Sequence, residues 1–268
     1  MNYVKNCLII TMLLGVGYSQ CNESNWEEYY PDMSGCYLVG ADLTGVNLSE
    51  TILYMADLSY ADLSGQVIQG INLDMANLEG ANLSYTQIFN GSFNSTNFTS
   101  ANLTNIIFDR SFFPFVNFTL ANLTNANLYN EVFMLANFTS ADLSGANLDH
   151  ARVKNANFTF ANLEDASLYR TNLHKADLSG ANLTNAACWG AFFTGSTLEG
   201  TIFDGADLTY AYFDETGDCE IGDNLFEVSC DGYDDVSYEA GATSGDLNLD
   251  GGNNVLDVVT LVNQILNP

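Results

Sequence analysis

The chain has very few positively charged residues. Its 268 residues include 6 Lys and Arg against 33 Asp and Glu, which gives a formal net charge of −27 at pH 7. Nucleic acids and anionic membranes attract basic proteins, so this balance argues against both as partners. We expect most of the acids to lie on a solvated surface and to keep the chain soluble.

Residues typical of catalytic and metal sites are also scarce. The chain has 2 histidines, His150 and His174, and neither has companions at the spacing of metal ligands. The sequence shows neither a nucleophile paired with a base nor a glycine-rich phosphate loop. It therefore predicts a protein that is not an enzyme.

No apolar run is long enough to predict a membrane-spanning helix. The run at residues 7–16 is shorter than the roughly 20 residues that a span requires. It follows Lys5 and precedes the small residues Gly17 and Ser19, a pattern typical of a cleaved secretory signal. We therefore expect residues 1–19 to be a signal peptide and the mature chain to be secreted or displayed at the cell surface.

A five-residue period dominates residues 36–214. Every fifth residue from Leu38 to Phe213 is apolar, with Cys188 the one departure, and the residue two positions earlier is usually Ala. Residues five apart step by about 140° around an α-helix, so the period excludes a helical face. It fits short extended units joined by two-residue corners, four of which turn through a square.

Several units match the pattern A-D/N-L-x-x, among them residues 41–45, 141–145 and 176–180. On these units, residues 36–214 resemble the pentapeptide-repeat family. The resemblance implies an all-β fold, a right-handed quadrilateral parallel β-helix, with about nine coils at four units each. Reading every twentieth residue gives the inward columns, one of which carries Phe98, Phe118, Phe138 and Phe158.

Two polar residues occupy inward positions that otherwise carry small residues. These are Gln66 and Glu131. We expect Glu131 either to distort its corner or to find a buried partner. A functional carboxylate is the alternative, because buried acids with shifted pKa values often belong to functional sites.

The cysteines suggest disulfides at both ends of the rod. After cleavage of the signal peptide five remain, and export permits disulfides. Among the three possible connectivities of the four flanking cysteines, local pairing is favoured and joins Cys21 to Cys36 and Cys219 to Cys230. Cys188 lies in an inward column, where we expect a buried free thiol. Residues 20–35, with their aromatics, would cap the first coil.

Large apolar residues replace polar ones at one corner of the predicted rod. They recur at multiples of twenty residues as Met55, Met75, Phe115 and Leu135. Side chains at these positions should point outward, and exposed apolar patches mark contact surfaces. The stripe is either a surface for a protein partner or a bed for a terminal segment of the same chain.

The acidic rod allows a different interpretation. Some pentapeptide-repeat proteins that protect gyrase are acidic rods of duplex-like shape, and the resemblance would imply an acidic-face inhibitor or DNA mimic. A duplex carries one charge per about 1.7 Å, so a rod of roughly 43 Å would need about 25. Residues 36–214 have a net charge of −12. This charge density and the predicted export both disfavour mimicry.

Residues 245–268 carry a second motif, which follows a predicted disulfide loop and acidic linker at residues 215–244. Its oxygen-bearing residues have the spacing of a calcium loop, with a carboxylate at the twelfth position: Asp246, Asn248, Asp250, Gly252 through its carbonyl, Asn254 and Asp257. The segment resembles half of a dockerin repeat, although Asn253 stands where an apolar residue is usual. The resemblance implies one Ca²⁺ site followed by a short helix.

Together these features predict an exported scaffold without enzymatic activity. Its C-terminal segment would dock or sort the protein in a calcium-dependent way. The partner would be another protein or, in a homodimer, a second copy of the chain. The rival interpretation, an enzyme or inhibitor using the acidic face, requires a convergent polar constellation that the sequence does not show.

Overall fold

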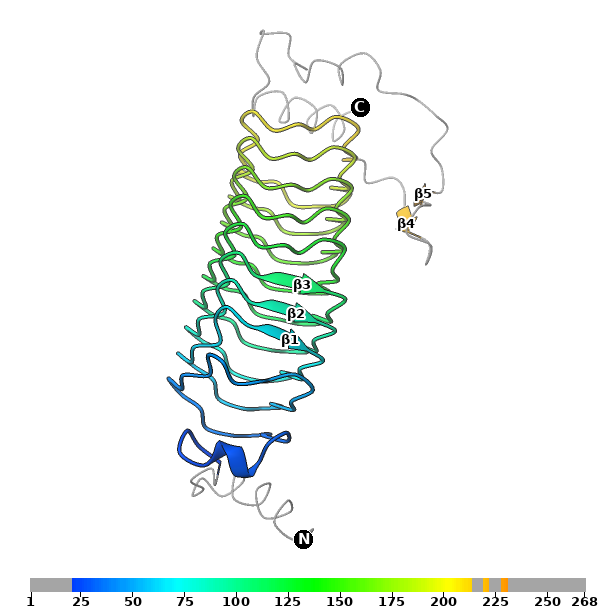
Figure 1. Ribbon diagram of the computed structural model, residues 1–268. Helices are drawn as coiled ribbons and strands as arrows, with labels where there is room; N and C mark the ends of the chain where they lie inside the picture. The colour runs from blue at the N-terminus through cyan, green and yellow to red at the C-terminus, as the bar shows by residue number, and fades with distance from the viewer. Residues whose placement is uncertain (1–20, 214–218, 222–227, 231–268) are drawn as a thin grey trace, which may run out of the picture.

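The structure, a computed structural model, describes residues 21–213, 219–221 and 228–230. Residues 21–213 wind into a stack of coils, with the short 3-10 helix η1 (Trp26–Glu28) at the N-terminal end (Figure 1). Three strands stack in successive coils: β1 (Val67–Gln69), β2 (Gln87–Phe89) and β3 (Ile107–Asp109). Across these described ranges there is no α-helix. The predicted all-β solenoid is confirmed as a parallel β-helix.

Each coil pairs with the next at an offset of twenty residues. Asp42 pairs in parallel with Asp62, which pairs with Asn82, and β1, β2 and β3 follow the same register. The backbone N–H of Leu43 donates to the carbonyl of Asp62 over 2.8 Å. Successive coils therefore satisfy each other's backbone groups, as burial requires. This pairing begins at Asp32, ahead of the predicted first repeat.

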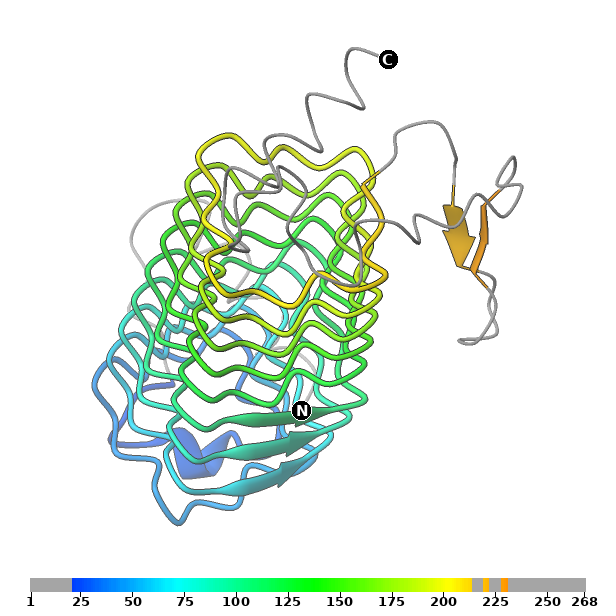
Figure 2. The same ribbon diagram turned by 90° about the horizontal axis from the view of Figure 1, so that it is seen from above.

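The core consists of the inward columns. Seen from above, successive coils repeat a similar outline, each displaced from the one before (Figure 2). Inside the coils the rings of Phe98, Phe118, Phe138 and Phe158 stack in succession, with centroids 5.1, 5.0 and 4.7 Å apart. The predicted phenylalanine column is therefore confirmed. The small residues of each unit are buried beside these large ones and leave room for them.

The corners explain the polar residues of each unit. The side chain of Asn97 accepts hydrogen bonds from the N–H and hydroxyl of Thr99, over 3.1 and 2.6 Å. Such Asx turns fix the chain direction. At Asp42 the same pair of bonds, here from Thr44, lowers the pKa of the carboxyl. The next corner residue adopts a left-handed conformation, as Met55 does with φ at 56°.

A disulfide bond lies at the N-terminal end of the rod. A disulfide joins Cys21 to Cys36, both of which are buried, and Trp26 packs against the same core. Beyond the rod, the antiparallel strands β4 (Cys219–Ile221) and β5 (Val228–Cys230) place Cys219 opposite Cys230 in their register. Facing residues of antiparallel strands have Cα atoms about 4.5–5.5 Å apart, a separation that a disulfide can span. The bond between these two cysteines stays a prediction.

Three predicted segments lie wholly or largely outside the described residues. They are the signal peptide at residues 1–19, the linker at residues 215–244 apart from β4 and β5, and the calcium segment at residues 245–268. The six expected calcium ligands all fall in the last of these.

Candidate interaction surfaces

One side of the rod differs in composition from the other three. We call it the Leu53 face, after its inward column. Its outward residues pair from coil to coil in the order Ile52, Asn72, Ser92, Phe112, Val132, Arg152, Asn172, Phe192 and Tyr212. The opposite side, which carries Asp42, presents mainly Asn and Asp at the equivalent positions. Along the Leu53 face, the exposed apolar residues lie in the half nearer the N-terminus, where Asn72, Asp74, Ser92, Asn94 and Ser95 are interspersed with them. The half nearer the C-terminus is basic and aromatic.

The predicted apolar stripe lies on the corner that ends this face. Met55, Met75, Phe115 and Leu135 have exposed fractions between 43% and 59%. All four adopt left-handed backbone conformations, with φ of 56–57°. This region is disfavoured by about 1–2 kcal/mol for a residue with a Cβ atom. The four side chains lie outside the core, so core packing does not explain why they are apolar.

Four further residues enlarge the stripe into an apolar patch. They are exposed and occupy adjacent positions of the same coils: Ile52, Tyr54, Phe112 and Met134. The hydroxyl of Tyr54 donates to the sulfur of Met75 over 3.3 Å, which links two coils across the surface. The sequence pattern at the last position of each unit does not include these four residues, because they occupy other positions of the same units. We use the name apolar patch for all eight residues.

Four positively charged residues lie on the basic half of this face and on the corner that precedes it, where Arg170 ends a unit of the neighbouring side. They are exposed: Arg152, Lys154, Arg170 and Lys175. None of the four makes an ion pair with a residue in the part of the chain that the structure describes. Arg110, farther toward the N-terminus, differs because its side chain lies 3.9 Å from Asp109. We call the four residues the basic patch.

Aromatic rings form a ladder along the corner beside the basic patch. The ladder contains Tyr129, His150, Tyr169, Trp189 and Tyr210, with successive ring centroids 5.7, 5.3, 4.9 and 5.2 Å apart. The guanidinium of Arg170 lies 5.5 Å from the ring of Tyr169 and 5.4 Å from that of Trp189. Cation–π contacts of this kind orient the charge. The sequence analysis did not predict this ladder.

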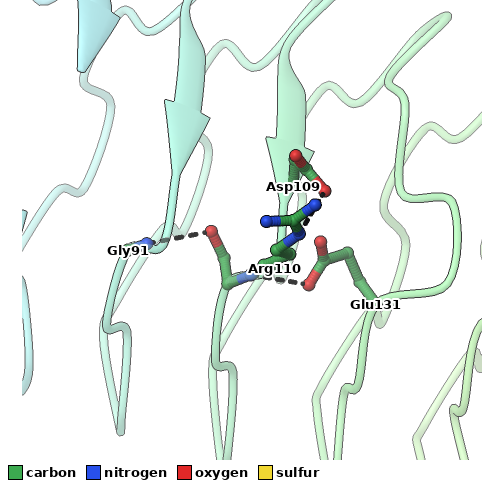
Figure 3. A network of polar contacts seen from close by, with 5 residues as sticks. Gly91, Asp109, Arg110 and Glu131 are labelled. Carbon is green, nitrogen blue, oxygen red and sulfur yellow. Dashed lines mark hydrogen bonds and ion pairs between the residues drawn. The ribbon is translucent and has the colours of Figure 1, made fainter. Parts of the chain in front are cut away.

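The inward Glu131 finds buried partners, which is one of the two expected outcomes. Its side chain is 2% exposed, and its carboxylate accepts the backbone N–H of Ser111 over 3.0 Å (Figure 3). Burial raises the pKa of Glu131 to about 7. The N–H groups of Ser111 and Arg110 oppose this rise, and the charge of Asp109 adds to it.

The backbone of the neighbouring coils explains why a carboxyl stands at this position. At an ordinary corner the N–H of the small inward residue donates three residues back, as Ala76 does to the carbonyl of Leu73. After β2 and β3 the equivalent N–H groups are satisfied from the next coil instead. The N–H of Gly91 donates to the hydroxyl of Ser111 over 3.1 Å, and that of Ser111 donates to Glu131. Glu131 therefore ends a column of irregular corners.

Gln66 and Cys188, the other unusual inward residues, have structural roles. The side-chain amide of Gln66 donates to the carbonyl of Leu43 over 2.8 Å. Cys188 is a buried free cysteine, and burial raises the pKa of its thiol. Within the described ranges no group of three or more His, Cys, Asp or Glu side chains is placed to hold a metal ion. No helix in those ranges is long and apolar enough to cross a membrane.

Coils of four five-residue units, with apolar columns inside and Asx turns at the corners, define a quadrilateral solenoid. The chain belongs to the family of pentapeptide repeats. The family model matches in 8 copies, which cover residues 32–65, 56–94, 76–114, 96–130, 117–155, 146–186 and 181–216 and so extend without a gap from 32 to 216.

Several solved structures are similar to the chain. HetL from Nostoc sp. strain PCC 7120, a pentapeptide repeat protein involved in heterocyst differentiation regulation, is 25% identical, with a TM-score of 0.45; the match covers 72% of this chain and 98% of HetL. QnrB1, a plasmid-mediated fluoroquinolone resistance protein, is 20% identical, with a TM-score of 0.38 and coverage of 65% and 93%. A search of curated proteins found no match.

Proposed function

We propose that the protein is an exported structural and interaction scaffold without enzymatic activity. In this proposal a right-handed rod of about nine coils holds a protein-binding surface in a fixed geometry. The observation that carries the proposal is the apolar patch, eight exposed apolar residues on one half of one face. Clusters of exposed large apolar residues mark interaction sites in proteins that are otherwise polar outside.

Export is part of the proposal and has two supports. The first is the signal-like pattern of residues 1–19. The second is the disulfide between Cys21 and Cys36, since such bonds persist in oxidising compartments. We propose that the mature protein acts outside the cytoplasm or at the cell surface.

The partner surface can be tested by changing the apolar patch. Replacing Phe112 and Phe115 by Ser should reduce capture of the partner from a pool of exported proteins by at least about tenfold, because central aromatic residues dominate binding energy. Leu120→Ser is a matched control: Leu120 and Phe115 are both 59% exposed, but Leu120 lies on another side of the rod. Equal capture by all three proteins, quantified by mass spectrometry, would count against the patch.

The proposal also assigns a calcium-dependent docking or sorting role to residues 245–268. The support is the ligand spacing from Asp246 to Asp257. Without calcium, three carboxylates would crowd one loop in a segment that has no base. The following residues would give a helix of only about nine residues, too short to form alone in water. Calcium binding should therefore order this segment and prepare it for a partner.

Calorimetric titration of the full-length protein tests the metal site. We expect binding of one Ca²⁺ per chain, and at least about tenfold weaker binding after Asp246→Ala with Asp250→Ala, which removes two of the charged ligands. The control is Asp234→Ala with Asp235→Ala, which removes two acids from the linker without touching the loop. Absence of calcium heat in the unmodified protein would remove the site from the proposal.

A further inference from the structure

The basic patch is electrostatically anomalous on this protein. Residues 36–214 contain five bases in all, and four of them form the patch. Asp149, the acid on the adjoining corner, already accepts hydrogen bonds from the hydroxyl of Ser167 and, over 2.9 Å, from the N–H of Tyr169. Four exposed positive charges without acidic partners among residues 21–213 therefore remain on a rod of net negative charge.

The aromatic ladder shapes what the patch can bind. Tyr169 and Trp189 stack with an interplanar angle of 9°, so their facing surfaces are covered by each other. Ring edges carry partial positive charge, and tyrosine and tryptophan add polar hydrogen atoms. With Arg170 held against two of these rings, the surface suits carboxylates better than neutral or positively charged groups.

The described part of the rod ends on this same face. Phe213 ends the inward Leu53 column, and the ring of Tyr212 stacks on that of Phe192 with centroids 4.8 Å apart. The coil register places Tyr212 three coils from Arg152, a rise of about 14 Å. The C-terminal segment at residues 231–268 contains 7 acids and no base. A random-coil chain of that length has an end-to-end distance of about 35 Å, which is enough to reach the whole patch.

We propose that the basic patch is the docking surface for the chain's own C-terminal segment, residues 231–268. Arg152, Lys154, Arg170 and Lys175 pair with carboxylates of this segment along the basic half of the Leu53 face and the corner that precedes it. Charge-assisted hydrogen bonds of this type are stronger than neutral ones. Tethering gives the segment an effective concentration in the millimolar range, which favours it over a free partner of similar charge. Docking does not require calcium, because four of the seven acids of the segment lie ahead of the proposed calcium loop: Asp231, Asp234, Asp235 and Glu239.

Carbodiimide cross-linking of the full-length protein in EDTA tests the proposal. The reagent joins an amine directly to a carboxylate that contacts it, and the side-chain amines of the chain are Lys5, Lys154 and Lys175. We expect peptides that link Lys154 or Lys175 to acids of residues 231–268. In a mixture of isotopically light and heavy protein, each linked pair should consist of two light peptides or two heavy peptides, because both come from the same copy of the chain.

Charge-neutralising variants provide the control. Arg152→Gln with Arg170→Gln keeps both lysines and should lower the yield of these links by about fivefold, which corresponds to about 1 kcal/mol of lost interaction. Arg110→Gln changes the base that lies beside Asp109 and should leave the yield unchanged. Links between light and heavy copies would assign the patch to a second copy and overturn the proposal. Links confined to acids of the rod, or no links at all, would overturn it as well.

Discussion

Replacing Phe118 by Ala should destabilise the rod by about 3–5 kcal/mol, because it removes a ring from the middle of a continuous stack. The ring is fully buried and lies 5.1 Å from that of Phe98 and 5.0 Å from that of Phe138, between centroids. In a solenoid each coil contacts only its neighbours, so no distant element can compensate for the cavity. Guanidinium unfolding followed by circular dichroism measures the loss.

A matched change three residues away provides the control. Phe115 belongs to the preceding corner and is 59% exposed, so Phe115→Ala removes the same side chain from the surface. Its effect on the free energy of unfolding should stay within about 0.5 kcal/mol. Equal shifts of the unfolding midpoint in the two variants would show that the inward column is not the source of stability.

Glu131 should make the stability of the protein depend on pH between about 5 and 8. Its pKa is about 7 in the folded protein, against an ordinary value of 4.5, so folding favours the protonated form. The stabilisation linked to this proton is complete below the unfolded pKa and is lost as pH rises through about 7. The separation of the two pKa values corresponds to about 3 kcal/mol.

Glu131→Gln isolates this contribution. The amide keeps a carbonyl oxygen for the N–H of Ser111 but cannot ionise. The variant should therefore be more stable than the unmodified protein at pH 8, and the difference should shrink at pH 5. Glu79→Gln, at an exposed acid, controls for removing one negative charge from an acidic chain. If the pH profile of the Glu131→Gln variant matched that of the unmodified protein, it would contradict a buried ionisable role.

The five-residue period alone was sufficient to predict the parallel β-helix and its inward columns. Residues such as Phe98 and Phe118 obey a single repeating rule, because every coil presents the same space to them. The partner of Glu131 could not be predicted in this way. It depends on the irregular backbone after β2 and β3, which leaves the N–H groups of Gly91 and Ser111 without their usual acceptors.

The aromatic ladder could not be predicted from the residues at any single position of the repeat unit. Tyr129, Tyr169 and Trp189 occupy the first corner position of their units, whereas His150 and Tyr210 occupy the second. Both positions extend from the same corner, so their rings meet in space although a twenty-residue spacing does not connect them. The predicted calcium ligands raise a different issue, since they lie beyond the periodic part of the chain and its register says nothing about them.

The coil register also limits how chains of this kind can change in length during evolution. Each unit turns the chain through a quarter of a circuit, and twenty residues return it to the same side. A deletion of five residues between Leu135 and Arg152 would move the basic patch to an adjacent side of the rod, out of line with the apolar patch. Only the gain or loss of whole coils would keep the two surfaces aligned. Selection on both surfaces would thus make length vary in steps of one full circuit.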